Sequence, residues 1–193
     1  MSPILGIWAS ANQSQYISTG SFESIATVTL SSAQATISFT SIPSTYKHLQ
    51  IRCITRTALS VSQQDSFYMT FNSDTGSNYA DHYMRGTGST IQVGSRTSQA
   101  NNLLGYQSAN GYTSGIFSPF IIDILDYANT SKYKTTRTLG GFESNNTGSE
   151  VGQIAFTSGL WMSTSAISSI QLVAGGGRNT VANSTFALYG IKG

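Results

Sequence analysis

Charged side chains are scarce in this sequence, since Asp, Glu, Lys and Arg make up only 9% of its 193 residues. An ordinary soluble domain carries roughly 25%. Solubility must therefore rest on hydroxyl, amide and backbone groups, which suits a protein held in an assembly or outside the cell. The formal net charge is +2, and the basic residues are spread from Lys47 to Lys192 with no run that would follow a phosphate backbone. We expect no nucleic-acid partner.

Cysteine is almost absent. Cys53 is the only one, which excludes an internal disulfide and a zinc site built from several thiolates. In the stretch "LQIRCIT" it has the same parity as Leu49 and Ile51, so we expect a buried, inert thiol. The sequence predicts no metal site and no cofactor.

Long apolar runs are missing too, and none reaches the roughly 18 residues that a membrane span needs. The first residues, "MSPILGIWASANQ", lack the positive region of a secretion signal. Their apolar stretch, from Ile4 to Trp8, is shorter than the usual core of about 7–15 residues. We therefore expect a soluble chain with no membrane partner and no secretion signal of its own.

Helical periodicity is nearly absent, and short alternating stretches bounded by turn residues take its place. About ten such strands, with turn signals roughly every 8–15 residues, predict an all-β fold, namely an antiparallel β-sandwich of the jelly-roll type. We assign residues 1–20 to an extended N-terminal arm and residues 21–193 to a single β-sandwich domain. Residues 72–79 are expected to form a loop or wide hairpin, and residues 86–115 long loops with one or two weak strands.

The chain ends on an apolar stretch, "FALYGIKG". Alternation places Phe186 and Leu188 toward the core, and Tyr189 and Ile191 on the opposite side. Apolar residues on both faces are typical of a strand in the middle of a sheet with both sides covered. Because the stretch "FIIDIL" has the same two-sided character, a second subunit is a candidate cover.

The sharpest group of chemically active residues is Asp74, Asp81 and His82, since carboxylates near a histidine can bind a metal or act as acid and base. Their spacing matches no specific ligand pattern, and Asp74 lies among turn residues where aspartate caps its own backbone.

A second pair of carboxylates, Asp123 and Asp126, resembles the pair of a glycosidase only if the fold brings the two together. Turn capping, or an ion pair of these aspartates with Lys132 or Lys134, is the simpler explanation. "GGGRN" lacks the lysine and hydroxyl residue of a phosphate-binding loop, and no Gly-x-Ser-x-Gly elbow occurs. We expect no catalytic residues and no enzymatic activity.

The N-terminal residues Ile4, Leu5, Ile7 and Trp8 would expose an apolar patch unless they dock against something. We therefore expect this arm to serve assembly or anchoring.

Several phrases, taken together, resemble a family of tailed-bacteriophage virion structural proteins, which decorate capsids or belong to fibres and appendages of phages of aquatic bacteria. The resemblance spans nearly the whole chain and rests on "PILGIWAS", "SFESIATVTL", "SIPSTYKHLQIR", "FNSDTGSNYADH", "IIDILDYANTSKYKTTRTLGG", "SGLWMSTSAISSIQLVAG" and "FALYGIKG". It implies a non-enzymatic component of the phage particle surface, with other virion proteins as partners. It also favours a homo-oligomer with threefold symmetry, since phage projections are frequently trimeric.

The alternative within the same setting is a receptor-binding tail-fibre tip that recognises a glycan on the host surface. Four tyrosines are the candidate glycan contacts, because aromatic rings suit the apolar faces of sugars. They are Tyr79, Tyr83, Tyr106 and Tyr112. Packing at the rim of a β-sandwich is the competing explanation for tyrosines in such positions.

Overall fold

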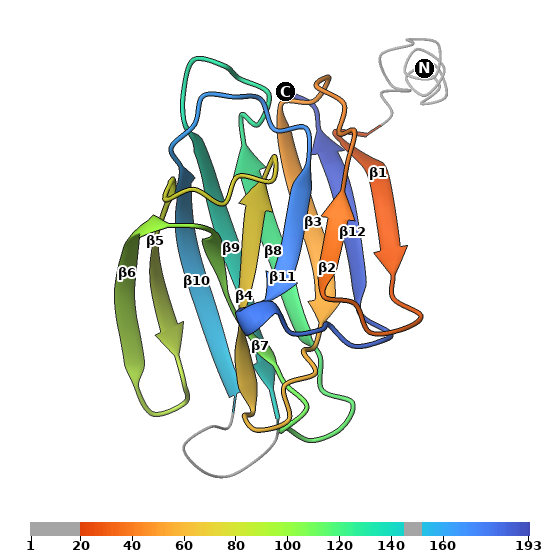
Figure 1. Ribbon diagram of the computed structural model, residues 1–193, viewed down its shortest axis with the longest axis vertical. Helices are drawn as coiled ribbons and strands as arrows, with labels where there is room; N and C mark the ends of the chain where they lie inside the picture. Colours follow the sequence, from red (N-terminus) through yellow and green to blue (C-terminus); the bar gives the residue numbers. More distant parts are fainter. Residues whose placement is uncertain (1–19, 145–151) are drawn as a thin grey trace, which may run out of the picture.

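The computed structural model describes residues 20–144 and 152–193, and this part of the chain folds into two antiparallel sheets (Figure 1). One sheet has eight strands and the other has four. In the view of Figure 1 the four-stranded sheet lies in front of the larger one. The predicted all-β sandwich is confirmed. The predicted arm, apart from Gly20, lies outside the described residues.

In spatial order, the strands of the larger sheet are β1 (Phe22–Thr29), β12 (Thr185–Ile191), β3 (His48–Thr55), β8 (Ser118–Leu125), β9 (Lys134–Glu143), β10 (Gly152–Trp161), β5 (Tyr79–Gly86) and β6 (Ile91–Gln99). Those of the smaller sheet are β2 (Thr36–Phe39), β11 (Ile170–Ala174), β4 (Gln64–Phe71) and β7 (Asn102–Ser108). A short 3-10 turn, η1 (Gly175–Gly177), follows β11.

The chain passes repeatedly from one sheet to the other. It alternates between them from β1 to β4, pairs β5 with β6 as a hairpin, crosses to β7, and returns for β8, β9 and β10. Neighbouring strands in each sheet therefore come from distant parts of the sequence. This holds for the order β1-β12-β3-β8 in the larger sheet and for β2-β11-β4-β7 in the smaller one. This order supports the jelly-roll topology, which stays a prediction.

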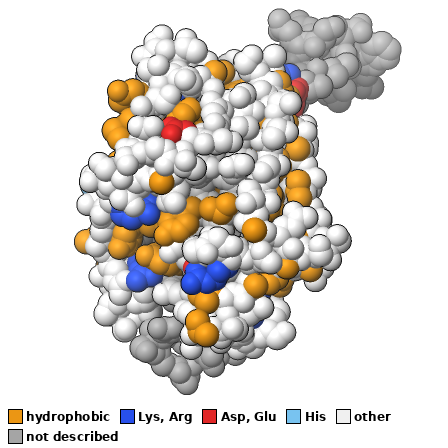
Figure 2. Space-filling model, viewed as in Figure 1, with side chains coloured by type: hydrophobic (Ala, Val, Ile, Leu, Met, Phe, Trp, Pro, Cys, Tyr) orange, Lys and Arg blue, Asp and Glu red, His pale blue; other side chains and the backbone are white. Residues whose placement is uncertain are grey.

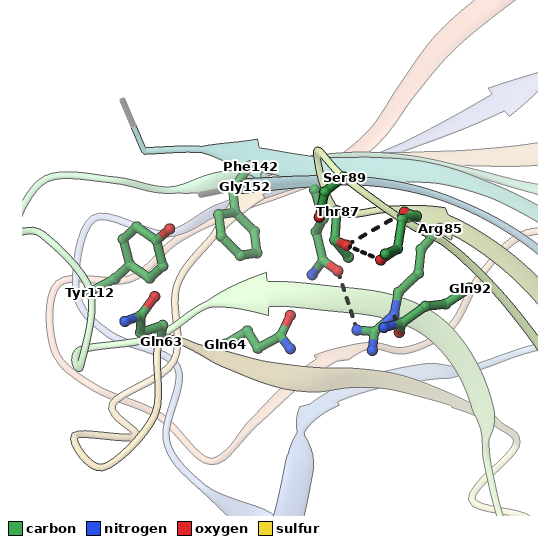
Figure 3. A pocket seen from close by; sticks show the side chains of 11 residues that line it. Gln63, Gln64, Arg85, Thr87, Ser89, Gln92, Tyr112, Phe142 and Gly152 are labelled. Carbon is green, nitrogen blue, oxygen red and sulfur yellow. Dashed lines mark hydrogen bonds between the residues drawn. The ribbon is translucent and has the colours of Figure 1, made fainter. Parts of the chain in front are cut away.

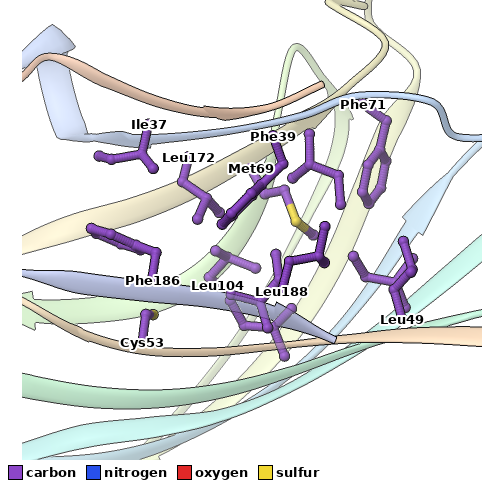
Figure 4. Packing of buried hydrophobic residues seen from close by; sticks show 14 of the residues in the cluster. Ile37, Phe39, Leu49, Cys53, Met69, Phe71, Leu104, Leu172, Phe186 and Leu188 are labelled. Atoms are coloured by element: carbon purple, nitrogen blue, oxygen red, sulfur yellow. The ribbon is translucent and has the colours of Figure 1, made fainter. Parts of the chain in front are cut away.

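The core lies between the two sheets and comes directly from the alternation of apolar residues along the strands (Figure 4). On β4, Phe67, Met69 and Phe71 are all fully buried. The Phe67 ring packs against Phe120 of β8 across the sandwich, with 5.2 Å between ring centroids. Cys53 is buried in the same core, as predicted, and burial raises the pKa of its thiol.

The last strand lies inside the larger sheet, second from its edge, and pairs with β1 on one side and β3 on the other, so it is an interior strand, as its two-sided apolar pattern predicts. Phe186 and Leu188 are fully buried in the core. On the opposite face, the Tyr189 ring contacts Phe22, with 6.0 Å between centroids, and the Arg52 guanidinium lies 5.8 Å from the Tyr189 ring. Neighbouring strands therefore cover part of that outer face.

Residues 86–115 depart from the sequence-based expectation, because they hold two full strands, β6 and β7, and only short loops. Strand β6 lies at the sheet edge with most of its residues exposed, so its apolar alternation is weak. Strand β7 is interrupted by an irregular register next to Gly105, whose φ of 136° favours glycine. Residues 72–79 form a crossing between the sheets and not a hairpin, since β4 and β5 belong to different sheets.

Candidate functional site

The candidate metal or acid–base group does not assemble. Asp74 lies in the crossing between the sheets, where its carboxylate accepts a hydrogen bond from Trp161 Nε1 at 2.7 Å, and this bond lowers its pKa. Asp81 is buried and pairs with Arg96. His82 is exposed and points to the other face of β5, because consecutive strand residues alternate.

Asp81 instead joins the two sheets. Its carboxylate accepts hydrogen bonds from Arg96 Nε at 2.9 Å and Nη2 at 2.6 Å, and from the backbone N–H of Leu103 at 3.0 Å. Arg96 Nη2 also donates to the carbonyl of Asn101 at 3.2 Å. These contacts attach the β5–β6 hairpin to the edge of β7. The Asp81–Arg96 pair is therefore structural.

The two carboxylates of the glycosidase hypothesis have separate partners. On β8, Asp123 accepts a hydrogen bond from Gln50 Nε2 at 2.7 Å. Asp126 lies in the following turn and forms ion pairs with Lys132 and Lys47. Hydrogen bonds from these two lysines lower the pKa of Asp126 to about 2. The predicted ion pair with Lys132 is confirmed, and the two carboxylates are held by different partners.

Within residues 20–144 and 152–193, no three His, Cys, Asp or Glu residues gather closely enough to hold a metal ion. The same part of the chain contains no helix with the length and apolar character to cross a membrane.

A polar pocket of about 310 Å³ opens at one end of the sandwich, where the β5–β6 turn approaches the start of β4 and the loop after β7 (Figure 3). Most of its lining side chains carry amides or hydroxyls. The lining residues are Gln63, Gln64, Arg85, Thr87, Ser89, Thr90, Gln92, Tyr112, Phe142, Gly152 and Gln153. We call this the Arg85 pocket.

Arg85 is held in place from three sides. Its guanidinium carbon lies 4.3 Å from the centroid of the Tyr106 ring, which is a cation–π contact. Its Nε donates to Gln92 Oε1 at 2.6 Å and its Nη1 to Gln153 Oε1 at 3.3 Å. A guanidinium has five N–H donors, so three remain without a partner among the described residues.

The opposite end of the pocket is aromatic. Tyr112 and Phe142 meet edge to face, with 5.5 Å between ring centroids (Figure 3). The loop that carries Tyr112 is held by Arg56, whose Nη2 donates to the Tyr112 carbonyl at 3.0 Å. Gly111 allows this loop to pack closely, because a Cβ there would lie 2.2 Å from the Ser62 carbonyl oxygen.

Of the four predicted glycan contacts, two lie beside Arg85 and one lies at the opposite end of the pocket. Tyr106 lies against the Arg85 guanidinium, Tyr83 packs edge to face on Tyr106 with 6.4 Å between centroids, and Tyr112 lines the pocket. Tyr79 must be removed from the predicted set, because it is fully buried and its hydroxyl donates to the backbone carbonyl of Asp74. Burial raises the pKa of Tyr79 to about 12.

A second candidate site covers the outer face of the larger sheet. Apolar side chains on six of its strands point away from the core and are between 43% and 76% exposed. They are Ile54, Met84, Ile91, Val93, Ile121, Leu139, Ile154 and Phe156. We call this set the outer apolar face.

Strand register makes this face continuous. Ile121 is the cross-strand partner of Leu139, Leu139 of Phe156, Phe156 of Met84, and Met84 of Val93. Directly opposed residues share one face of a sheet and contact each other. The five side chains therefore form one row across β8, β9, β10, β5 and β6.

A hollow of about 740 Å³ lies beside this row. Pro119, Leu139 and Ile154 line it, and Gly86 and Gly141 contribute no side chains to fill it. The hollow is therefore a shallow apolar depression within the outer apolar face.

The predicted anchoring residues, Ile4, Leu5, Ile7 and Trp8, lie outside the described residues.

No protein-family model matches this sequence, and no curated protein matches it. Function is therefore argued from the two sites themselves.

Sequence reasoning missed Arg85 and its glutamine partners. Arg85 and Gln92 are cross-strand neighbours only through the β5–β6 hairpin, and Gln153 comes from β10. The turn at Gly88, whose φ is 85°, was a usable signal, because two-residue hairpin turns favour glycine at the first central position. That signal would have paired Arg85 with Gln92 but would not have brought in Gln153.

Proposed function

We propose that this chain is a non-enzymatic structural subunit of a tailed-phage particle, displayed on the particle surface as a homo-oligomer. The resemblance of its sequence to virion structural proteins gives the setting. The observation that carries the proposal is the outer apolar face. Soluble monomers rarely expose a contiguous apolar patch of this kind, and such patches mark association surfaces.

A second copy of this chain is the occupant that the surface favours. Arg137 and Asp123 are cross-strand partners on the same outer face, at the border of the apolar row. Arg137 has no hydrogen-bond or ion-pair partner among the described residues. Because opposite charges lie side by side on one copy, a second copy can meet each charge with its opposite. Closed symmetry then repeats one interface in every subunit.

The threefold arrangement remains the proposed symmetry, since the resemblance to phage projections favours it. The low content of charge supports close packing, because few like charges would have to be brought together on association. On the face seen in Figure 2, charged atoms are few and most of the surface is uncharged.

Gold-labelled antibodies against this protein, applied to purified particles of the phage that encodes it, test the proposal. We expect label at a fixed position on head or tail. We also expect a chain lacking residues 1–12 to fold normally and to be lost from the particles, because the arm supplies the anchor. Particles that carry no label after gradient purification would contradict the structural role, and unchanged incorporation of the shortened chain would contradict the anchor.

Glycan recognition is the second candidate function, and the Arg85 pocket favours it. Tyr83, Tyr106 and Tyr112 lie in or beside a pocket whose remaining lining is rich in amides and hydroxyls. Such groups can satisfy the hydroxyls of a sugar, while the aromatic rings suit its apolar faces. A particle protein with this pocket would contact the host surface as well as its neighbours.

A further inference from the structure

We infer that the Arg85 pocket binds a saccharide that carries a carboxylate, with Arg85 receiving the acid group and the glutamines receiving ring hydroxyls. The inference rests on the proposed glycan recognition and names the chemical class of its ligand. It concerns the end of the sandwich at the β5–β6 turn and is independent of the outer apolar face.

The charge of Arg85 is the first argument. Two other arginines are each paired with a buried aspartate: Arg96 with Asp81, and Arg178 with Asp65 at 3.3 Å. Arg85 forms no ion pair with any carboxylate that the structure describes, although it lies in a pocket and is only partly exposed. Among the described residues its positive charge therefore has no carboxylate counter-ion, which suits an anionic ligand.

The fixed geometry of Arg85 is the second argument. The guanidinium carbon lies over the Tyr106 ring, and Gln92 and Gln153 each accept a hydrogen bond from one of its donors. Since the side chain is already ordered, a ligand would not have to restrict it on binding. The fork of the remaining N–H donors matches the two oxygens of a carboxylate.

The rest of the lining indicates a sugar. Amide side chains of Gln63 and Gln64 lie across the pocket from Arg85 (Figure 3), and hydroxyls from Thr87, Ser89 and Thr90 form the rim. Tyr112 and Phe142 supply an apolar wall at the far end. A carboxylate at one end, hydroxyls along the middle and an apolar ring face together describe an acidic pyranose.

Phosphorylated ligands fit the pocket less well. Among the residues that the structure describes, Arg85 is the one cationic side chain in the lining, and no described lysine lines the pocket. Phosphate sites generally combine several cations or a row of backbone N–H groups at a helix N-terminus. One guanidinium matches the single charge of a carboxylate.

Titration with two acidic oligosaccharides, digalacturonate and sialyllactose, tests the inference. Each is compared with its own methyl ester, which removes the charge and keeps the sugar. We expect at least one acid to bind about tenfold or more tightly than its ester, because the ester cannot form a charge-assisted hydrogen bond with the guanidinium. Isothermal calorimetry or ligand-observed NMR gives the dissociation constants.

Three arginine variants make the test specific. Arg85→Gln should abolish the preference for the acid, whereas Arg52→Gln, which removes an exposed charge on β3, should keep it. Arg85→Lys keeps the charge without the fork and should retain only part of the preference. Arg85→Lys also replaces Arg85→Gln as the test variant if Arg85→Gln fails to fold, which circular dichroism would reveal.

The outcomes separate the inference from the function on which it rests. Equal binding of acid and ester would overturn the inference and leave glycan recognition standing. Absence of binding by all four saccharides would overturn both. A preference that survives in a folded Arg85→Gln or is undiminished in Arg85→Lys would place the acid group elsewhere and overturn the inference.

Discussion

At the scale of single residues, the few charges of this chain are mostly used to hold loops and edges together. Asp81 is the clearest case, because its side chain is fully buried and it joins Arg96 to the backbone of β7. Removing one member of a buried ion pair leaves the other charge buried without a partner. The loss of stability is then larger than the net stabilisation that the intact pair provides.

We predict that Asp81→Asn lowers the free energy of unfolding by about 3 kcal/mol. In a domain of this size that corresponds to a fall of about 6–12 °C in melting temperature. Its exposed neighbour provides the control, since His82→Asn should change the free energy of unfolding by less than about 0.5 kcal/mol. Similar melting temperatures for both variants would show that the buried pair does not hold the sheets.

Asp126 gives the protein a defined response to acid. Its pKa is about 2 in the folded protein, because of Lys132 and Lys47, and about 3.9 in an unfolded chain. A carboxyl group with a lowered folded pKa stabilises the protein above its unfolded pKa, and this contribution is lost as the pH falls through the folded value.

Asp126→Asn should therefore be less stable than the natural chain at pH 6, and the difference should shrink between about pH 4 and pH 2. Asparagine suits this position because it tolerates the positive φ of 48°. Urea denaturation across this pH range measures the difference. High salt should reduce it as well, since both lysines are more than half exposed. A difference in stability between Asp126→Asn and the natural chain that stays constant with pH would show that the Asp126 carboxylate does not stabilise the fold through its lysine partners.

At the scale of elements, the sequence predicts a strand best when one of its faces is apolar and the other is polar. Strand β4 carries Phe67, Met69 and Phe71 on one face, and all three are buried where alternation placed them. Strand β6 has little contrast between its faces, so the pattern indicated long loops with at most one or two weak strands in this region. The Arg85 pocket could not be predicted, because its members become neighbours only through the pairing of β5 with β6 and β10.

The last strand allows a direct test at this scale. Leu188 lies in the middle of β12 and is fully buried, whereas Ile191 is the last residue of β12 and is only partly buried. We predict that Leu188→Ala lowers the free energy of unfolding by about 3 kcal/mol, because it leaves a cavity that the sheets cannot fill. Ile191→Ala should have a clearly smaller effect in the same denaturation experiment. Equal effects would mean that β12 is not held as a central strand.

At the scale of the whole molecule, the structure offers two candidate sites with different proposed roles. The outer apolar face of the larger sheet is proposed to bind a second copy, and the Arg85 pocket at the end of the sandwich is proposed to bind a host saccharide. The two proposals use different residues, so each can fail without the other. Self-association is the central claim, because the outer apolar face is the feature that a monomer explains least well.

Light scattering on the purified full chain, coupled to size-exclusion chromatography at micromolar concentration, measures this claim most directly. We predict a mass of three times 20.6 kDa for the natural chain. Phe156→Lys places a charge in the middle of the apolar row and should give a folded monomer, whereas Val61→Lys, at an exposed apolar residue outside that row, should leave the oligomer unchanged. A measured mass of 20.6 kDa for the natural chain would contradict self-association. An oligomer that is unaffected by Phe156→Lys would contradict the role of the outer apolar face.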